Sequence, residues 1–360
     1  MNGNKKRRET KYSTQKKLIF TKTLGKLMTI DKIRVSIGSA SVLGLYDSIR
    51  FKDPPTTCYI MTYKQGHCVA NCGFCPQARE SEGSTENLSR VNWPEYSFKE
   101  FLTRLSYLAP NKRFKRICIQ TLNYSNAFHD LVEIITEIKR ITDIPISVAA
   151  PPISKENMRE LKLIGIDRIG IALDASTPEI FNNVKGKNTN GPYSWENHFA
   201  TIEEALDIFT DGQITTHLIV GLGETSKEIL ELIQKLNDQK IRVSLFAFTP
   251  IKGTKLENLE SPEILQFRKI QLGRYLIVKQ NKHLKDFTFN SKGNIIKYNI
   301  NKKELWDLID TSDLLLTSGC PGCNRPYYTS RPSGPIYNYP RELTEVEKQV
   351  SYNSLLKFVN

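Results

Sequence analysis

The chain has 360 residues, of which 39% are hydrophobic and 9% aromatic, and this content excludes an intrinsically disordered protein. We expect a cytoplasmic protein, because no apolar run approaches the ~20 residues that span a bilayer and no secretory core opens the sequence. Seven cysteines would suggest disulfides in a secreted chain, but here they indicate a reducing compartment.

The net charge of +13 is concentrated at the N-terminus, where residues 1–26 hold nine Lys or Arg and one acid, Glu9. Such an arm can bind nucleic acid or an acidic protein, and a solvated flexible tail explains it at least as well. The aromatic and glycine pattern of an RNA-binding module is missing. We therefore assign residues 1–50 to a basic, partly flexible extension and expect neither nucleic acid nor a membrane as a partner.

From about residue 55, strand-like runs alternate with helix-like runs, which predicts parallel strands joined by right-handed crossovers. The expected strands are 57–63, 116–121, 146–149, 168–173, 214–220, 243–248, 287–290 and 314–317. The expected helices lie near 94–108, 127–141, 154–164, 195–210, 225–239, 262–281 and 302–310. Eight such strands match a (β/α)8 TIM-type barrel of about 250 residues.

This pattern places the barrel in residues 51–318, with a C-terminal extension at 319–360. The run at 287–290 is the weakest strand of the set. If it fails, the barrel is incomplete.

Three cysteines, Cys68, Cys72 and Cys75, follow the first strand at Cys-x3-Cys-x2-Cys spacing. Three thiolates leave one iron of a 4Fe–4S cubane open to a small molecule, whereas structural zinc usually needs paired Cys-x2-Cys hooks. With Phe74 before the third cysteine, the run resembles the loop of radical S-adenosylmethionine (SAM) enzymes. The resemblance implies that SAM chelates the open iron and yields a 5′-deoxyadenosyl radical. No side chain is expected to act as the catalyst.

Two later strand ends hold candidate SAM contacts. Asp174 follows the strand at 168–173, where an acid can accept hydrogen bonds from a ribose or cap the next helix. Gly221 lets the backbone approach an adenine, and Glu224 can cap a helix or orient the loop amides. Together with Lys252-Gly253-Thr254, these segments resemble biotin synthases.

The resemblance implies that Asp174 contacts the SAM ribose and that Phe74 lies against the adenine. Gly221 and Glu224 are assigned to the SAM site more loosely. One departure is Ala172, which stands where biotin synthase has an Asn. Contacts made by that Asn must be absent or supplied elsewhere.

The remaining cysteines suggest a second cluster. Side chains in the run 116–121 alternate between the two faces of a strand, and this alternation points Cys118 into the lumen. A single free cysteine, however, is more often a core residue. Cys320 and Cys323 form a Cys-x2-Cys hook without the second pair that a zinc ribbon needs. Cys118 can be the third ligand beside Cys320 and Cys323, and Cys58 is the alternative third ligand. The fourth ligand is left open between Ser318, Arg325, a sulfide and water.

We place the hook on the same rim as the first cluster, with a cavity for an acyl chain between the two clusters. The loop 72–79, Cys118 and the segment 319–328 resemble biotin-synthase-related proteins of archaea, some of which act as a two-component lipoyl synthase.

The resemblance implies sulfur insertion into an octanoyl-lysine on a carrier domain or peptide. An auxiliary 4Fe–4S cluster would be the sulfur source. A paralogous radical SAM protein and an electron donor such as ferredoxin would be partners. Two alternatives stay open: biotin synthase-type insertion into a free small molecule, and an isomerase or lyase with a second cluster that is not consumed.

Overall fold

The computed structural model describes residues 29–47, 51–108 and 113–360. The basic arm at 1–26, for which the sequence predicts poor order, lies outside these ranges. Among the described residues, no helix combines the length and the apolar character that a membrane span requires.

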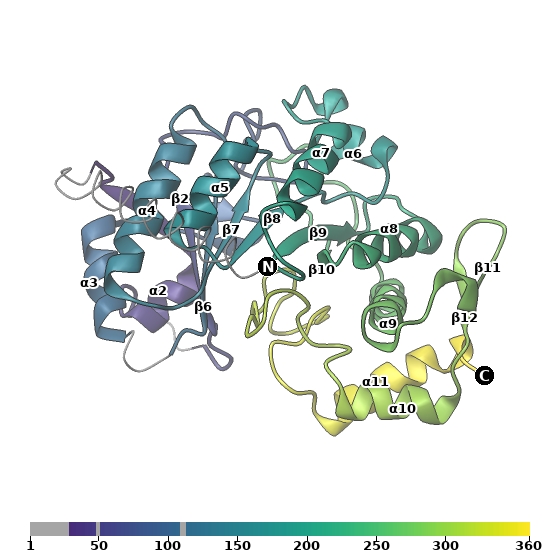
Figure 1. Cartoon of the computed structure of the whole chain (residues 1–360). Coiled ribbons are helices and arrows are strands. Elements are labelled where there is room, and N and C mark those ends of the chain that lie inside the picture. Colours follow the sequence, from purple (N-terminus) through teal and green to yellow (C-terminus); the bar gives the residue numbers. More distant parts are fainter. Residues whose placement is uncertain (1–28, 48–50, 109–112) are drawn as a thin grey trace, which may run out of the picture.

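Six neighbouring parallel strands make up most of an eight-stranded sheet, as the alternation of strands and helices predicts (Figure 1). They are β2 (Thr57–Thr62), β6 (Arg116–Gln120), β7 (Ile146–Ala150), β8 (Arg168–Ile171), β9 (Ile214–Val220) and β10 (Arg242–Ala247). Each strand pairs with the next one along the chain, and the sheet order is β10-β9-β8-β7-β6-β2-β1-β5. The α/β fold class is therefore confirmed.

Helices cover one face of this sheet, as Figure 1 shows. They are α3 (Phe98–Leu108), α4 (Ala127–Ile141), α5 (Lys155–Ile164), α6 (Pro178–Val184), α7 (Trp195–Leu206), α8 (Ser226–Asp238) and α9 (Ile264–Gln280). Along β6, Ile117 and Ile119 are fully buried in the main core, whereas Cys118 between them lines a cavity. The alternation along β6 is the one predicted from its period of two.

The closed eight-stranded barrel is wrong, and the incomplete barrel is the form that occurs. Strand β11 (Phe287–Phe289) pairs with β12 (Ile295–Tyr298) in a separate hairpin. The turn between them is local: the Asn290 side chain accepts hydrogen bonds from the amides of Lys292 and Asn294, and Gly293 has a φ of +74°. Turn chemistry of this kind favours a hairpin over a long crossover.

The last expected strand, 314–317, does not form. After α10 (Lys302–Thr311) this segment makes only an isolated bridge, between Leu316 and Tyr339. The amide of Thr317 donates to the Tyr339 carbonyl at 3.0 Å, and the amide of Tyr339 donates to the Leu315 carbonyl at 3.0 Å. These backbone groups are paired with a later part of the chain and are not used in the sheet.

The described part of the N-terminal extension adds a strand to the sheet, and the last helix of the chain packs on other helices. Strand β1 (Lys32–Val35) runs antiparallel between β2 and β5 (Glu95–Ser97), and α2 (Ile37–Leu43) follows it. The sheet thus begins before the expected boundary at residue 51. At the other end, α11 (Glu345–Leu355) contacts α9 and α10.

The tail between α10 and α11 is fixed to α9 by the buried Arg268, whose guanidinium donates to the carbonyls of Ile336 and Tyr337. A two-residue ladder, β3 (Asn87–Leu88) with β4 (Val91–Asn92), lies in the connection between β2 and β5.

Candidate functional site

The cysteine loop after β2 is closed by its own backbone. The amide of Cys68 donates to the Gln77 carbonyl at 2.8 Å, and the amide of Arg79 donates to the Ala70 carbonyl at 2.9 Å. Gly73 packs so closely that an added Cβ would lie 3.3 Å from the Leu256 side chain. These contacts bring three thiols onto one compact loop at the carboxyl end of the first parallel strand.

The three thiols of this loop interact electrostatically and have a chemistry that suits iron. Burial raises the pKa of Cys72 to about 12, with smaller opposing effects from the charges of Lys185 and Asp174. Burial also raises the pKa of Cys75, followed by the effect of Cys72. Ligation by a cation is the ordinary way to ionise such thiols. The amide of Asn123 already donates to the Cys68 sulfur at 3.1 Å.

The three thiols of the loop are not arranged as a site for a single metal ion. In residues 29–47, 51–108 and 113–360, no three His, Cys, Asp or Glu side chains lie close enough together to hold one metal ion. A zinc ion needs its ligands about 2.0–2.3 Å from one centre. In a cubane each thiolate binds a different iron, so the sulfurs are spread apart. Cys68, Cys72 and Cys75 stay the predicted ligands of the 4Fe–4S cluster.

Asp174, the predicted ribose contact, lies at the wall of a cavity. It follows β8 with a φ of +64°, a conformation that is costly for a non-glycine residue and often marks a functional site. Its side chain lines the cavity described below and accepts a hydrogen bond from Lys185 Nζ at 2.7 Å. Thr177, and not Asp174, caps helix α6. The alternative role of Asp174 as a helix cap is therefore wrong.

Lys185 is a residue that the sequence interpretation missed. Its side chain is 7% exposed, and its ammonium also donates to the Ala172 carbonyl. It lies over the Tyr193 ring, 5.4 Å from the ring centroid. Nothing in the local sequence pairs this lysine with Asp174, because α6 lies between them. The ion pair fixes the carboxylate at the cavity wall.

We predict that Asp174→Asn weakens SAM binding by about 1–3 kcal/mol, the range for a hydrogen bond to a charged group. The substitution keeps the side-chain shape but removes the charge that faces Lys185. Isothermal titration with SAM measures the change in affinity. Asp207→Asn, at an exposed ion pair with Lys155, is the matched control and should leave SAM affinity unchanged. Equal affinities of Asp174→Asn and wild type would contradict the ribose assignment.

Glu224 orients the glycine loop. Its carboxylate accepts hydrogen bonds from the amides of Gly221 at 2.7 Å and Leu222 at 2.9 Å, while Thr225 caps helix α8. Gly221 has a φ of +104°, and a Cβ there would meet Pro262 at 2.8 Å. Of the two roles that the sequence leaves open for Glu224, the structure supports loop orientation.

We predict that Glu224→Ala destabilises the fold by about 1–3 kcal/mol, because it leaves two amides without their acceptor. Glu231→Ala, on the exposed side of α8, should change stability by less than about 0.5 kcal/mol. Urea unfolding followed by circular dichroism measures both. Equal effects of the two substitutions would show that the carboxylate is not needed to hold the loop.

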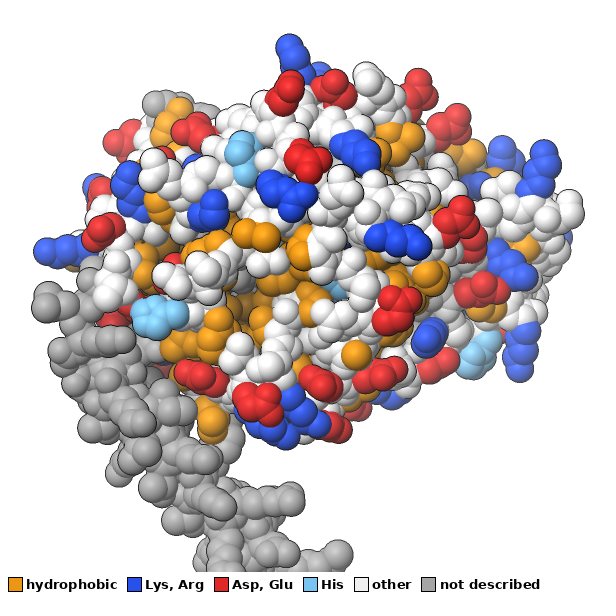
Figure 2. Space-filling view, turned by 90° about the horizontal axis from the view of Figure 1, so that it is seen from above, with side chains coloured by type: hydrophobic (Ala, Val, Ile, Leu, Met, Phe, Trp, Pro, Cys, Tyr) orange, Lys and Arg blue, Asp and Glu red, His pale blue; other side chains and the backbone are white. Residues whose placement is uncertain are grey.

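A cavity of about 760 Å³ connects the two groups of candidate ligands. Phe74, Cys75 and Asp174 line one part of it, and Cys118, Cys320 and Cys323 line another. Seen from above, the molecule has a hollow surrounded by hydrophobic side chains (Figure 2). The predicted cavity between two cysteine sites is therefore present.

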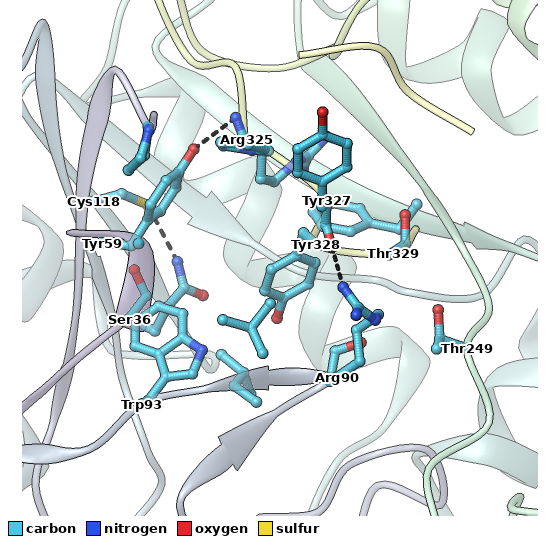
Figure 3. A pocket seen from close by; sticks show the side chains of 18 of the residues that line it. Ser36, Tyr59, Arg90, Trp93, Cys118, Thr249, Arg325, Tyr327, Tyr328 and Thr329 are labelled. Carbon is cyan, nitrogen blue, oxygen red and sulfur yellow. Dashed lines mark hydrogen bonds between the residues drawn. The ribbon is translucent and has the colours of Figure 1, made fainter. Parts of the chain in front are cut away.

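Figure 3 shows the polar contacts within this cavity. The Tyr59 hydroxyl hydrogen-bonds with the Cys323 sulfur at 3.1 Å and accepts from the Arg325 amide at 3.1 Å. Gln120 donates to the Cys118 sulfur at 3.2 Å. Arg90 donates to the Tyr327 carbonyl at 2.6 Å, which fixes the tail over the cavity. The sequence interpretation missed Tyr59. Tyr59 lies two residues before Met61 on the same strand, so both side chains are on one face, and this periodicity could have indicated Tyr59.

Cys118, Cys320 and Cys323 come together as predicted. Burial raises the pKa of Cys118, and the nearby Cys320 and Cys323 raise it further. Cys320 also hydrogen-bonds with the Ser147 hydroxyl at 3.5 Å. Cys58 is fully buried in the hydrophobic core, so Cys118 is the better third ligand.

The position predicted for the hook is wrong. Its neighbours are Arg116 and Arg242, the first residues of β6 and β10, and the Thr56 hydroxyl, which donates to the Gly322 carbonyl. The hook thus lies at the amino ends of the strands, while the Cys68 loop lies at the carboxyl ends. The physical reason is that 314–317 forms no strand, so the chain is free to run back across the sheet.

Parts of the chain are similar to known proteins. Residues 62–236 match the model of the radical SAM superfamily. A biotin synthase of Methanococcus vannielii is 29% identical over 228 residues, covering 61% of this chain and 63% of the relative. A biotin synthase of Streptococcus agalactiae is 24% identical and covers 68% of this chain and 82% of the relative. The chain thus spans less than two thirds of the first of these relatives.

Among solved structures, methylornithine synthase has a TM-score of 0.48 at 14% identity, covering 67% of this chain and 66% of that protein. The hydrogenase maturase of Carboxydothermus hydrogenoformans has a TM-score of 0.47 at 19% identity, covering 61% of this chain and 51% of that protein. The match to this family model supports the predicted 4Fe–4S cluster and SAM. Residues 62–236, which include the cysteine loop and most of the parallel strands, are thus similar to the radical SAM superfamily.

Proposed function

We propose that this radical SAM enzyme inserts sulfur into an unactivated C–H bond of its substrate. The observation that carries the proposal is the shared cavity, with Cys75 and Asp174 in one part and Cys118, Cys320 and Cys323 in another. The sequence similarity to biotin synthases supports the same reaction class. When bound, the clusters and SAM would supply a 5′-deoxyadenosyl radical and a sulfide.

The side chains around the cavity would bind SAM, orient it and exclude water. Asp174, held by Lys185, would accept the ribose hydroxyls, and Phe74 would stack on the adenine. Burial lowers the pKa of His217 to about 4, so its imidazole is neutral at physiological pH. It therefore adds no positive charge to the cavity that it lines. The tail around Tyr328 covers the cavity and would keep water from the radical.

The names of the relatives favour a biotin synthase-type substrate, which is a free small molecule. The composition of the cavity wall favours the second candidate, an octanoyl-lysine on a lipoyl carrier. Its lining includes Tyr46, Phe51, Trp93, Phe246 and Phe248. Ala172 also presents a methyl group where biotin synthase has an amide. An alkyl chain suits such a wall better than a polar ring does.

Mass spectrometry of products tests the proposal. The reconstituted, reduced protein is incubated with SAM and either dethiobiotin or an octanoyl-lysine peptide. A gain of sulfur in one substrate, with formation of 5′-deoxyadenosine, supports sulfur insertion and identifies the substrate class. Formation of 5′-deoxyadenosine with a rearranged or cleaved product that lacks sulfur would instead support the isomerase or lyase alternative.

If the substrate is octanoyl-lysine, we propose two protein partners. A paralogous radical SAM protein would add the other sulfur, and a ferredoxin-type donor would supply the electron. The octanoyl-lysine assay with and without the paralogue distinguishes one inserted sulfur from two. A dithiol product from this chain alone would remove the need for the paralogue.

A further inference from the structure

Two arginines bracket Cys320. Arg242, the first residue of β10, donates to the carbonyl of Gly319 at 3.3 Å. Arg116, the first residue of β6, donates through Nε to the carbonyl of Pro321 at 3.5 Å. The residues before and after this cysteine are thus held by guanidinium groups from two different strands. The hook itself closes with the Cys323 amide donating to the Cys320 carbonyl at 3.1 Å.

The surroundings of the hook hold more positive than negative side-chain charge. The positive charges of Arg168 and Arg274 lie near that of Arg242. The acids near these arginines are Asp313, whose charge acts on Arg242 and Arg274, and Asp167. Asp167 pairs with Arg116 at 2.7 Å and with Arg168 at 3.1 Å, so one carboxylate serves two cations.

Arg242 is incompletely paired. Burial lowers the pKa of Arg242, Arg168 lowers it further, and Cys320 acts in the opposite direction. Its Nε is buried without a hydrogen-bond acceptor among the described residues. Buried guanidinium groups in excess are unfavourable unless an anion accompanies them. Cys118, Cys320 and Cys323, once ionised, would supply that negative charge.

We infer that Arg116 and Arg242 are positioning residues of the auxiliary cluster, which hold the Cys320 turn by its carbonyls and offset the negative charge of its three thiolates. This inference rests on the proposed second cluster. A nearby cation favours the more negative, reduced state of a cluster. The two arginines should therefore raise the reduction potential of the auxiliary cluster and slow the loss of its iron.

The test separates charge from hydrogen bonding at Arg242. All variants are made in a Cys68→Ala, Cys72→Ala and Cys75→Ala background, so that only the auxiliary cluster is observed. Arg242→Gln removes the charge, and Arg242→Lys keeps it while removing the guanidinium geometry. Arg331→Gln is the control, since Arg331 is an exposed arginine of the same tail. Potentials are measured by redox titration followed by electron paramagnetic resonance, and iron loss by chelator competition.

We expect Arg242→Gln to lower the equilibrium constant for one-electron reduction about tenfold, a shift of about 59 mV to more negative potential. Arg242→Lys should keep the potential but lose auxiliary iron faster than the control. An unchanged potential together with unchanged iron loss would overturn the inference. If Arg242→Gln does not fold, the rate of iron loss from Arg242→Lys tests the inference: faster loss than in the control supports it, and equal loss overturns it. A parent protein without any second cluster would refute the proposed function itself.

Discussion

Replacing Cys68, Cys72 and Cys75 together by alanine is expected to abolish 5′-deoxyadenosine formation. The three thiols lie on one loop closed by backbone hydrogen bonds, and Cys75 lines the cavity beside Asp174. Without these ligands SAM has no iron to chelate and no route for the electron. Chromatography of 5′-deoxyadenosine after incubation with dithionite and SAM measures the effect, which should be a loss to background.

The triple variant should still fold. Cys72 and Cys75 are only partly buried, and the loop backbone keeps its hydrogen bonds to Gln77 and Ala70. Mössbauer spectroscopy should still detect the auxiliary cluster in this protein. SAM cleavage at wild-type rate by a folded triple variant would refute the central assignment.

Replacing Cys320 or Cys323 by alanine is expected to stop sulfur transfer while SAM cleavage continues. Each variant leaves two of the three proposed ligands, which is too few to hold a cubane firmly. The Cys68 loop lies at the opposite ends of the strands and keeps all of its contacts. Product mass spectrometry and 5′-deoxyadenosine assays on the same sample should therefore separate the two activities.

Cys58→Ala is the matched control for these variants. Cys58 is a free, fully buried cysteine one residue from Tyr59, but it packs in the hydrophobic core. Its loss should cost about 1 kcal/mol through a small cavity and leave sulfur transfer intact. Iron analysis adds a second check, because two cubanes hold about twice the iron of one. A zinc ion at Cys320 and Cys323 would contradict the sulfur-insertion proposal.

The sequence by itself determined the parallel strands of the sheet and the grouping of Cys68, Cys72 and Cys75 on one loop. Six of the predicted strands occur in parallel and in chain order. They could be predicted because hydrophobic periodicity and the handedness of crossovers depend on residues that are close together in the sequence. Cys68, Cys72 and Cys75 were identifiable because their spacing in one short loop carries the chemistry. The inward direction of Cys118 also followed from a period of two along β6.

Tertiary structure alone decided the ends of the barrel and the place of the hook. The turn at Asn290 and Gly293 favours a hairpin, and residues 314–317 pair with Tyr339 in place of the sheet. Cys320 is therefore carried to the amino ends of the strands, where Arg116 and Arg242 hold it. Charges from separate strands meet there only after folding, and no pattern in the sequence records contacts over such separations.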